Sequence, residues 1–207
     1  ELYDPQLDAE STSQIDEQIQ EETESGGAKV SRFLLDLVQM LLVTLVLYVL
    51  IDAVIGRVQV ESISMLETVK PGELLMVSKF AYRSDDFQRG DIVVFHYPGN
   101  PNEDYIKRVI GLPGDTVTVL DEQVFINGYI LDEPYIREDP NYNGEWVVPE
   151  DSLFVLGDNR NQSSDSHDWG YVPFDNVFGR ALMIYWPLDE FAIFSRIDPV
   201  SAATTLP

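Results

Sequence analysis

Residues 116–131 read TVTVLDEQVFINGYIL, and this stretch decides the fold class of the chain. Its apolar runs are short and rich in Val, Ile and Phe, which is typical of β-strands. Asn127-Gly128 separates the last two runs. This dipeptide is the strongest short hairpin signal, because both central residues of a type I′ turn have positive φ. The stretch therefore predicts strands at 116–120, 123–126 and 129–131, with a tight hairpin at Asn127-Gly128.

Similar short runs continue on both sides of this stretch. Further strands are predicted at 58–62, 73–78, 91–96, 105–110, 152–156 and 180–185. Turn-forming residues separate them, as at Pro71-Gly72 and Pro113-Gly114-Asp115. Strands that recur about every ten residues favour an antiparallel sandwich or barrel over alternating βαβ units. The expected fold is therefore mainly β, an antiparallel β-sandwich or barrel-like domain.

A long apolar run precedes the β-region. Residues 33–51 read FLLDLVQMLLVTLVLYVLI, in which Asp36 is the only charged residue. As a helix this run is about 28 Å long, close to the hydrocarbon thickness of a bilayer. A buried core helix is the alternative, but such a helix normally carries a polar stripe, and only Thr44 and Tyr48 are polar in residues 41–51. We therefore interpret residues 29–56 as a transmembrane anchor.

The residues around the span predict its direction. A cleaved signal peptide is disfavoured, because residues 52–56 lack small residues at both positions of an A-x-A site. Lys29 and Arg32 precede the span and Arg57 follows it. This weak positive-inside bias predicts a single-pass protein of the cell membrane, with a cytoplasmic N-terminus and residues 57–207 on the extracytoplasmic side. The lipid bilayer is thus an expected partner.

The composition is strongly acidic. The 207 residues include 36 acidic and 13 basic side chains, a formal charge of −23, which argues against a nucleic-acid binder because such proteins need a basic face. Residues 1–28 hold nine acids and no base, and are interpreted as a disordered acidic cytoplasmic tail, with an acidic docking tail as the alternative. The chain has no cysteine and only His96 and His167, which excludes disulfides, cysteine nucleophiles and poly-histidine metal sites.

Three segments carry the residues that are suited to catalysis. Residues 60–68 read VESISMLET, and without context their two serines would satisfy backbone groups in a turn. Residues 104–111 read DYIKRVIG, where strand alternation places Lys107 and Arg108 on opposite faces, so that Lys107 is either snorkelling or desolvated. Residues 157–170 read GDNRNQSSDSHDWG, a polar loop after a predicted strand, and such loops commonly carry functional sites.

In this order after an N-terminal span, the three segments resemble the signature boxes of the type I signal peptidases, or leader peptidases. The matching residues are Ser62-Ile63-Ser64-Met65, Tyr105-Ile106-Lys107-Arg108 with Gly111-Leu112-Pro113-Gly114-Asp115, and the Gly-Asp-Asn-Arg box that begins at Gly157. Residues 89–95, RGDIVVF, also resemble the family's intervening strand. The resemblance covers about residues 30–187, and it leaves the acidic tail and a C-terminal extension at 188–207 unexplained.

The resemblance implies a serine endopeptidase that uses a serine–lysine dyad, with no cofactor and no metal. Ser64 would be the nucleophile and Lys107 the general base, and the Ser64 backbone N–H and the Ser62 hydroxyl would form the oxyanion hole. A free lysine, with a pKa of about 10.4, is neutral in only about one molecule in 2,500 at pH 7. Burial between apolar neighbours can lower that pKa by about 3–5 units, which brings the amine near the working pH.

The resemblance also implies roles for residues around the dyad. Ser163 would position the lysine amine. Asp158 would pair with Arg108, and Asp165 would pair with the residue at position 167. The shallow pockets for small substrate side chains at −1 and −3 would be lined by Val58, Val60, Met65, Tyr105 and Ile106.

Two residues depart from the family pattern. Glu67 stands where the family usually has proline, so the turn after Ser64 is expected either to be looser or to hold a carboxylate near the site. His167 stands where the family usually has arginine. Because a His167–Asp165 pair weakens once His167 is neutral, the loop is predicted to be less ordered above about pH 7.

Together these features predict a membrane-bound serine endopeptidase that removes signal peptides from exported preproteins, with residues 57–187 as its extracytoplasmic catalytic domain. Preprotein signal peptides are the expected partners, and the oligomeric state is left open. A catalytically silent, membrane-tethered β-domain with a binding or scaffolding role is the alternative, supported only by Glu67 and His167. A soluble self-cleaving repressor protease is disfavoured, because residues 1–28 are acidic where a DNA-binding domain would be basic.

Overall fold

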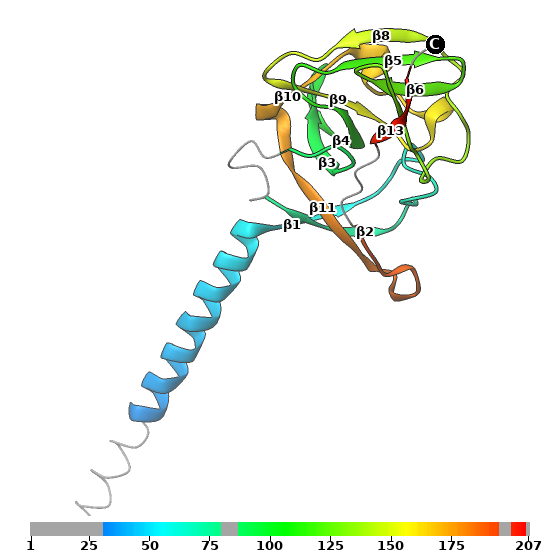
Figure 1. Cartoon of the computed structure of the whole chain (residues 1–207). Helices are drawn as coiled ribbons and strands as arrows, with labels where there is room; N and C mark the ends of the chain where they lie inside the picture. Colours follow the sequence, from blue (N-terminus) through cyan, green and yellow to red (C-terminus); the bar gives the residue numbers. More distant parts are fainter. Residues whose placement is uncertain (1–30, 80–86, 195–199, 206–207) are drawn as a thin grey trace, which may run out of the picture. The chain divides into compact units, whose positions relative to one another are not determined.

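The computed structural model describes residues 31–79, 87–194 and 200–205, and Figure 1 shows their elements. The chain divides into two compact units between residues 51 and 52. The first contains most of the N-terminal helix, Ser31–Val54, and the second contains the β-strands. The predicted acidic tail at residues 1–28 lies outside the described residues.

The N-terminal helix is apolar around its whole circumference. Its 24 residues have a mean hydropathy of 2.5, and the large apolar side chains from Phe33 to Ile51 are exposed. A core helix of a soluble domain would instead bury one face. The helix is thus long and apolar enough to cross a bilayer, whose hydrocarbon core needs about 20 residues.

The β-unit is built from two antiparallel sheets in its described residues. The larger sheet has the order β1-β2-β11-β3-β4-β9-β10, and β12 pairs with β11. Its strands are β1 (Ile55–Gln59), β2 (Leu74–Ser78), β3 (Ile92–Tyr97), β4 (Asn100–Gly111), β9 (Ser152–Leu156), β10 (Val172–Pro173), β11 (Val177–Trp186) and β12 (Ala192–Ile193). The smaller sheet has the order β13-β7-β6-β5-β8. Its strands are β5 (Thr116–Leu120), β6 (Gln123–Ile126), β7 (Tyr129–Leu131), β8 (Gly144–Val147) and β13 (Val200–Thr205).

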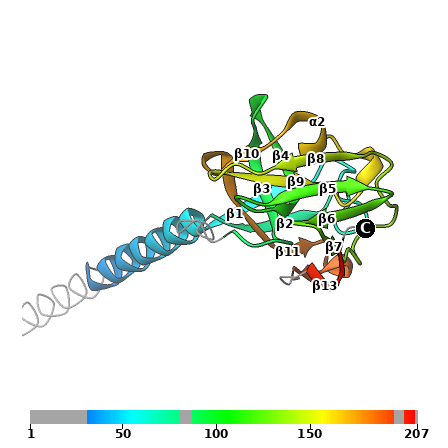
Figure 2. The same cartoon turned by 45° about the horizontal axis from the view of Figure 1, so that its top comes forward.

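The two sheets share a hydrophobic core. Ile110 of β4 and Phe154 and Leu156 of β9 pack with side chains of the smaller sheet, among them Val117 and Ile126. Figure 2 shows β5, β6 and β8 beside β4 and β9. The opposite face of β9 contributes Leu153 and Val155 to a second cluster. Strand β9 and the second half of β4, residues 106–111, are therefore central and buried on both faces, which makes this half of β4 a rigid base for the side chains that it presents.

The predicted antiparallel β-fold is confirmed, with some changes of boundary. Asn127 and Gly128 have φ values of 52° and 85°, and they connect β6 to β7 as the hairpin signal predicts. The first strand ends at Gln59 instead of reaching Ser62, although the Val60 N–H still donates to the Glu73 carbonyl at 2.9 Å. Strand β8 was not predicted, because the four residues GEWV lack an apolar run.

Short helices interrupt the second half of the chain. The loop between β9 and β10 contains η1 (Arg160–Gln162) and α2 (Ser166–Trp169), and further 3₁₀ turns are η2 (Phe174–Asn176) and η3 (Leu188–Glu190). We refer to residues 157–170 as the polar loop. It begins where β9 ends, which places it beside the central strand β4.

Candidate active site

Ser64 lies in the turn of residues 63–69, the Ser64 turn, whose buried side chains attach it to the hydrophobic core. Met65 and Val69, on the same turn, are completely buried in the cluster formed by the larger sheet. The Val69 N–H donates to the Met65 carbonyl at 2.8 Å, and the Leu66 N–H donates to the Ile63 carbonyl at 3.2 Å. The side chain next to Ser64 thus anchors the turn, and the Ser64 residue itself is only 6% exposed.

Lys107 faces Ser64 from the central strand β4. The Nζ atom of Lys107 lies 2.7 Å from Ser64 Oγ, although the two residues are 43 positions apart in the chain. In the charged state the ammonium donates to Oγ, whereas the neutral amine accepts the hydroxyl proton. The Ser62 Oγ lies 3.2 Å from Ser64 Oγ. The structure therefore brings together the three side chains expected for the dyad and the oxyanion hole.

The surroundings of Lys107 favour its neutral form. Lys107 is 3% exposed, and this burial lowers the pKa of its amine from 10.5 to about 8, against the opposing charges of Asp165 and Asp158. With a pKa of about 8, about one molecule in ten carries the free base at pH 7, against about one in 3,000 for an amine with the ordinary value of 10.5. Burial thus makes Lys107 usable as a base near neutral pH.

The polar loop holds the backbone on both sides of the Ser64 residue. The Asn159 N–H donates to the Ser64 carbonyl at 3.0 Å, and Asn159 Nδ2 donates to the Ile63 carbonyl at 3.1 Å. Gly157 makes this approach possible, because a Cβ at this position would lie 2.5 Å from the Ser64 carbonyl oxygen. Sequence reasoning named neither role, although both residues belong to the Gly-Asp-Asn-Arg box.

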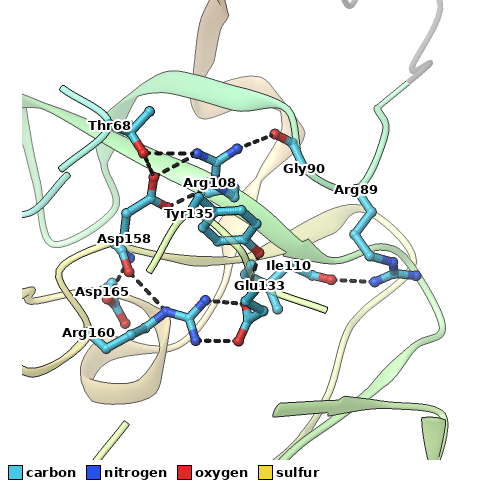
Figure 3. A network of polar contacts seen from close by, with 11 residues as sticks. Thr68, Arg89, Gly90, Arg108, Ile110, Glu133, Tyr135, Asp158, Arg160 and Asp165 are labelled. Atoms are coloured by element: carbon cyan, nitrogen blue, oxygen red, sulfur yellow. Dashed lines mark hydrogen bonds and ion pairs between the residues drawn. The ribbon is translucent and has the colours of Figure 1, made fainter. Parts of the chain in front are cut away.

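Arg108 and Asp158 form a buried ion pair beside the dyad (Figure 3). Arg108 Nε donates to Asp158 Oδ1 at 2.8 Å, and Arg108 Nη2 donates to Oδ2 at 2.6 Å. Thr68 Oγ1 also donates to Asp158 Oδ2, at 2.5 Å, and Arg108 Nη1 donates to the Gly90 carbonyl at 3.0 Å. The predicted pair is present, and it connects the polar loop to both β4 and the Ser64 turn.

Asp165 is fully buried and pairs with His167. The Asp165 carboxylate accepts the Gly157 N–H at 2.9 Å and lies 2.6 Å from His167 Nδ1. His167 Nε2 lies 3.1 Å from Asp168, and the imidazole stacks on Tyr142 with ring centres 3.9 Å apart. Partial burial by itself would lower the pKa of His167, but the hydrogen bond and charge of Asp165, with the charge of Asp168, raise it overall.

Two predictions about the site, for Ser163 and Met65, differ from what the structure shows. Ser163 Oγ is buried and, within the described residues, has no hydrogen-bond partner, so the predicted contact with the lysine amine is not formed. For the departure at position 67, the structure shows a Glu67 side chain that is 57% exposed and pairs with Arg137 at 3.2 Å. Met65 serves the core, because its complete burial in the larger-sheet cluster removes it from the predicted substrate pocket.

An open groove of about 770 Å³ passes the dyad. Ser64 and Lys107 lie in its wall, and the other predicted pocket residues that line it are Val58, Val60, Tyr105 and Ile106. The groove thus presents apolar side chains next to Ser64 and Lys107. Among the described residues, no cluster of three or more histidine or carboxylate side chains is arranged to hold a metal ion.

The chain is also similar to known proteins in sequence and structure. The family model described as signal peptidase, peptidase S26, matches residues 34–186. Signal peptidase I of Leptolyngbya laminosa is 50% identical over 139 residues, which cover 63% of this chain and 68% of that protein. A protein named probable signal peptidase I-1, from Synechocystis sp., is 39% identical over 184 residues, 84% of this chain and 94% of that protein. A crystal structure of a signal peptidase I from Enterococcus faecalis V583 aligns at 36% identity with a TM-score of 0.43, over 46% of this chain and 97% of that one.

Proposed function

This chain belongs to the signal peptidase family, peptidase S26, and from that membership we propose that it is a membrane-anchored serine endopeptidase that removes signal peptides from exported preproteins. The observation that carries the proposal is the 2.7 Å separation between Ser64 Oγ and a desolvated Lys107 amine. A nucleophile within hydrogen-bond reach of a base with a lowered pKa is the arrangement that activates a serine hydroxyl. Membership of a peptidase family also argues against the silent scaffold.

The proposed reaction begins when neutral Lys107 accepts the Ser64 hydroxyl proton. Oγ then attacks the carbonyl carbon of the scissile bond, and the Ser62 hydroxyl and the Ser64 N–H donate to the oxyanion that develops. The lysine ammonium gives its proton to the leaving amine, which departs as the new N-terminus of the mature protein. Neutral Lys107 then takes a proton from a water molecule, which attacks the acyl carbonyl carbon. The lysine ammonium returns that proton to Ser64 Oγ as the ester bond breaks, and the signal peptide leaves with a new C-terminal carboxyl group.

The groove supports a preference for small residues at −1 and −3. Val58, Val60 and Ile106 line it beside Ser64, so it fits short apolar side chains better than long ones. Within the described residues, β1 pairs only with β2 and therefore leaves one edge free. A substrate in an extended conformation can add a strand at such an edge, and its alternate side chains at −1 and −3 then face the same side.

The membrane orientation is part of the proposal. The N-terminal helix would cross the bilayer once, with residues 1–28 in the cytoplasm and the catalytic β-unit outside. Lys29 and Arg32 before the helix support this direction. The substrate would then reach the groove as the extended segment that follows its own membrane-embedded signal helix.

A cleavage assay tests the catalytic assignment. A peptide with alanine at −1 and −3 is incubated with the wild type, Ser64→Ala and Lys107→Ala in detergent. Both variants are expected to lose at least about a thousandfold in kcat, because each removes a member of the unit that forms the acyl-enzyme. Lys70→Ala is the matched control, since Lys70 is exposed and pairs with Glu190, and it should retain activity. Undiminished hydrolysis by Ser64→Ala or Lys107→Ala would refute the assignment.

A further inference from the structure

The segment that connects β7 to β8, residues 132–143, reaches the polar loop through a buried ion pair. The Glu133 carboxylate faces the Arg160 guanidinium with two contacts: Arg160 Nη1 donates to Oε2 at 2.8 Å, and Arg160 Nη2 donates to Oε1 (Figure 3). The Arg160 side chain is fully buried and that of Glu133 is nearly so. A buried guanidinium depends on its carboxylate, since removal of one partner leaves an uncompensated charge.

Tyr135, in the same segment, contacts the second buried arginine. Its ring centre lies 3.9 Å from Arg108 Cζ, and its hydroxyl donates to Glu133 Oε1 at 2.8 Å. Stacking on a guanidinium fixes the plane of that group and hence the direction of its N–H bonds. Glu133 and Tyr135 therefore hold each other, and together they contact both arginines that organise the polar loop.

From the two arginines the contacts continue to the nucleophile. Arg108 holds the Asp158 carboxylate, and Arg160 Nε donates to the Gly157 carbonyl at 3.1 Å. Asn159 lies between these fixed positions, and its two N–H donors bind the carbonyls of Ser64 and Ile63. The hydrogen bonds from Asn159 to the Ser64 turn thus lie between two arginines that the β7–β8 connection contacts, Arg160 through Glu133 and Arg108 through the Tyr135 ring.

We propose that Glu133 and Tyr135 are positioning residues for Ser64, which act through Arg160 and Arg108 on residues 157–159 and so set the approach of the Ser64 hydroxyl to Lys107. The inference rests on the proposed function, and it adds two residues from outside the three sequence boxes. Neither side chain lines the groove. Their effect should therefore fall on the chemical step and not on substrate binding, because a misplacement of about 1 Å lowers reaction rates strongly.

Steady-state kinetics and hydrogen exchange test this role together. Glu133→Gln keeps the size of the side chain but removes its charge, and Tyr135→Phe keeps the ring but removes the hydroxyl. We expect Glu133→Gln to lower kcat about tenfold with KM changed by less than twofold, and Tyr135→Phe to lower kcat by about threefold. Exchange at the amides of residues 62–66 and Asn159 should accelerate in the same order.

Asp115→Asn is the matched control for general loosening of the fold. Asp115 is also buried and pairs with an arginine, Arg89, at 2.9 Å, but it lies in the turn between β4 and β5. This variant should leave kcat and the exchange of residues 62–66 unchanged. An equal fall of kcat in Asp115→Asn, or a folded Glu133→Gln with wild-type kcat and exchange, would overturn the proposal. If Glu133→Gln does not fold, Tyr135→Phe decides by the same readouts.

A double-mutant cycle tests the route of the effect. Asn159→Ala removes one of the two hydrogen bonds to the Ser64 turn, so Glu133→Gln should lower kcat less in the Asn159→Ala background than in the wild type. Fully additive losses would contradict action through Asn159. Failure of the proposed function is distinguishable, since it would appear as cleavage by Ser64→Ala, while the exchange measurements still report whether Glu133 and Tyr135 hold the turn.

Discussion

Lys107 shows how the position of one residue creates the chemistry of the site. It occupies β4 opposite Val93 of β3, in a strand whose neighbours on both sides are buried. Its position in the buried part of the strand shields the amine from water, and the Ser64 turn supplies its hydrogen-bond partner. The same lysine at a strand end would keep its solvent and its proton. Its proposed use as a base is therefore a property of the site and not of the residue type.

The pKa of Lys107 predicts the pH dependence of catalysis. Activity should rise with pH and level off above about 8, because only the neutral amine accepts the Ser64 proton. Lys107→Arg should be inactive at every pH, because its guanidinium stays protonated. A pH profile of kcat/KM from pH 6 to 10 measures this. A wild-type profile without an inflection between pH 7 and 9 would contradict the assignment of Lys107.

The same lowered pKa makes the stability of the folded β-unit depend on pH. Below pH 8 both folded and unfolded chains hold the proton, so the folded protein bears the full cost of the buried charge. Between pH 8 and 10.5 the unfolded chain binds the proton more tightly than the folded one, and this cost fades as the pH rises. The need for a base and the stability of the fold thus oppose each other at this residue near neutral pH.

At the scale of elements, the polar loop joins parts of the β-unit that no single strand connects. Asp158 binds β4 through Arg108, and Asn159 binds the Ser64 turn. Asp165 accepts the N–H of Gly157 and so closes the loop on itself. The loop is short of apolar side chains, and its order depends on these charged and hydrogen-bonded groups. Its stability is therefore expected to respond to pH and salt more than that of the strands.

The raised pKa of His167 predicts that the order of the polar loop depends on pH. Because the pKa of His167 is raised above 6.5 by Asp165 and Asp168, its stabilising charge is fully present below pH 6.5 and is lost as the pH rises through the raised value. Loop amides at residues 157–168 should therefore exchange faster at pH 8 than at pH 6, after correction for the intrinsic rates. His167→Arg keeps its charge and should remove this difference. Equal protection of the wild type at both pH values would contradict the prediction.

At the scale of the whole molecule, two units of different character follow each other in the chain. The N-terminal helix exposes its large apolar side chains, whereas the β-unit buries most of its own in clusters and exposes a minority, such as Trp186 and Leu188. The helix by itself is stable only where its surface meets an apolar solvent. The proposed function depends on this difference. A helix anchored in the bilayer would keep the groove at the same membrane that holds the signal helix of the substrate.

The absence of cysteine from the chain allows a direct test of the proposed orientation. Ser13→Cys and Glu150→Cys each introduce a single thiol, the first before the helix and the second at an exposed position of the β-unit. A membrane-impermeant maleimide added to intact cells should label Glu150→Cys and not Ser13→Cys, and both should react after the membrane is permeabilised. Labelling of only Ser13→Cys in intact cells would reverse the proposed topology.

The sequence by itself determined the class of the fold and the identity of the main candidates. The Asn127-Gly128 hairpin, the short apolar runs and the long apolar run at residues 33–51 depend on local backbone geometry and on hydrophobic patterning, which are readable from neighbouring residues. Ser64, Lys107 and the Arg108–Asp158 pair were found because they lie in recognisable boxes. The fold-class inferences need no knowledge of which distant segments meet, and for the Arg108–Asp158 pair the family resemblance supplied that knowledge.

Only the tertiary structure decided what surrounds each candidate. It buried Met65 in the core, turned Glu67 toward Arg137, left Ser163 without the predicted partner in the described residues, and placed Glu133 and Tyr135 against two arginines. The sequence has no local signal for these contacts, because they join segments far apart in the chain. Burial and pKa are likewise set by all the atoms packed around a group, so they emerge only when the two sheets close on each other.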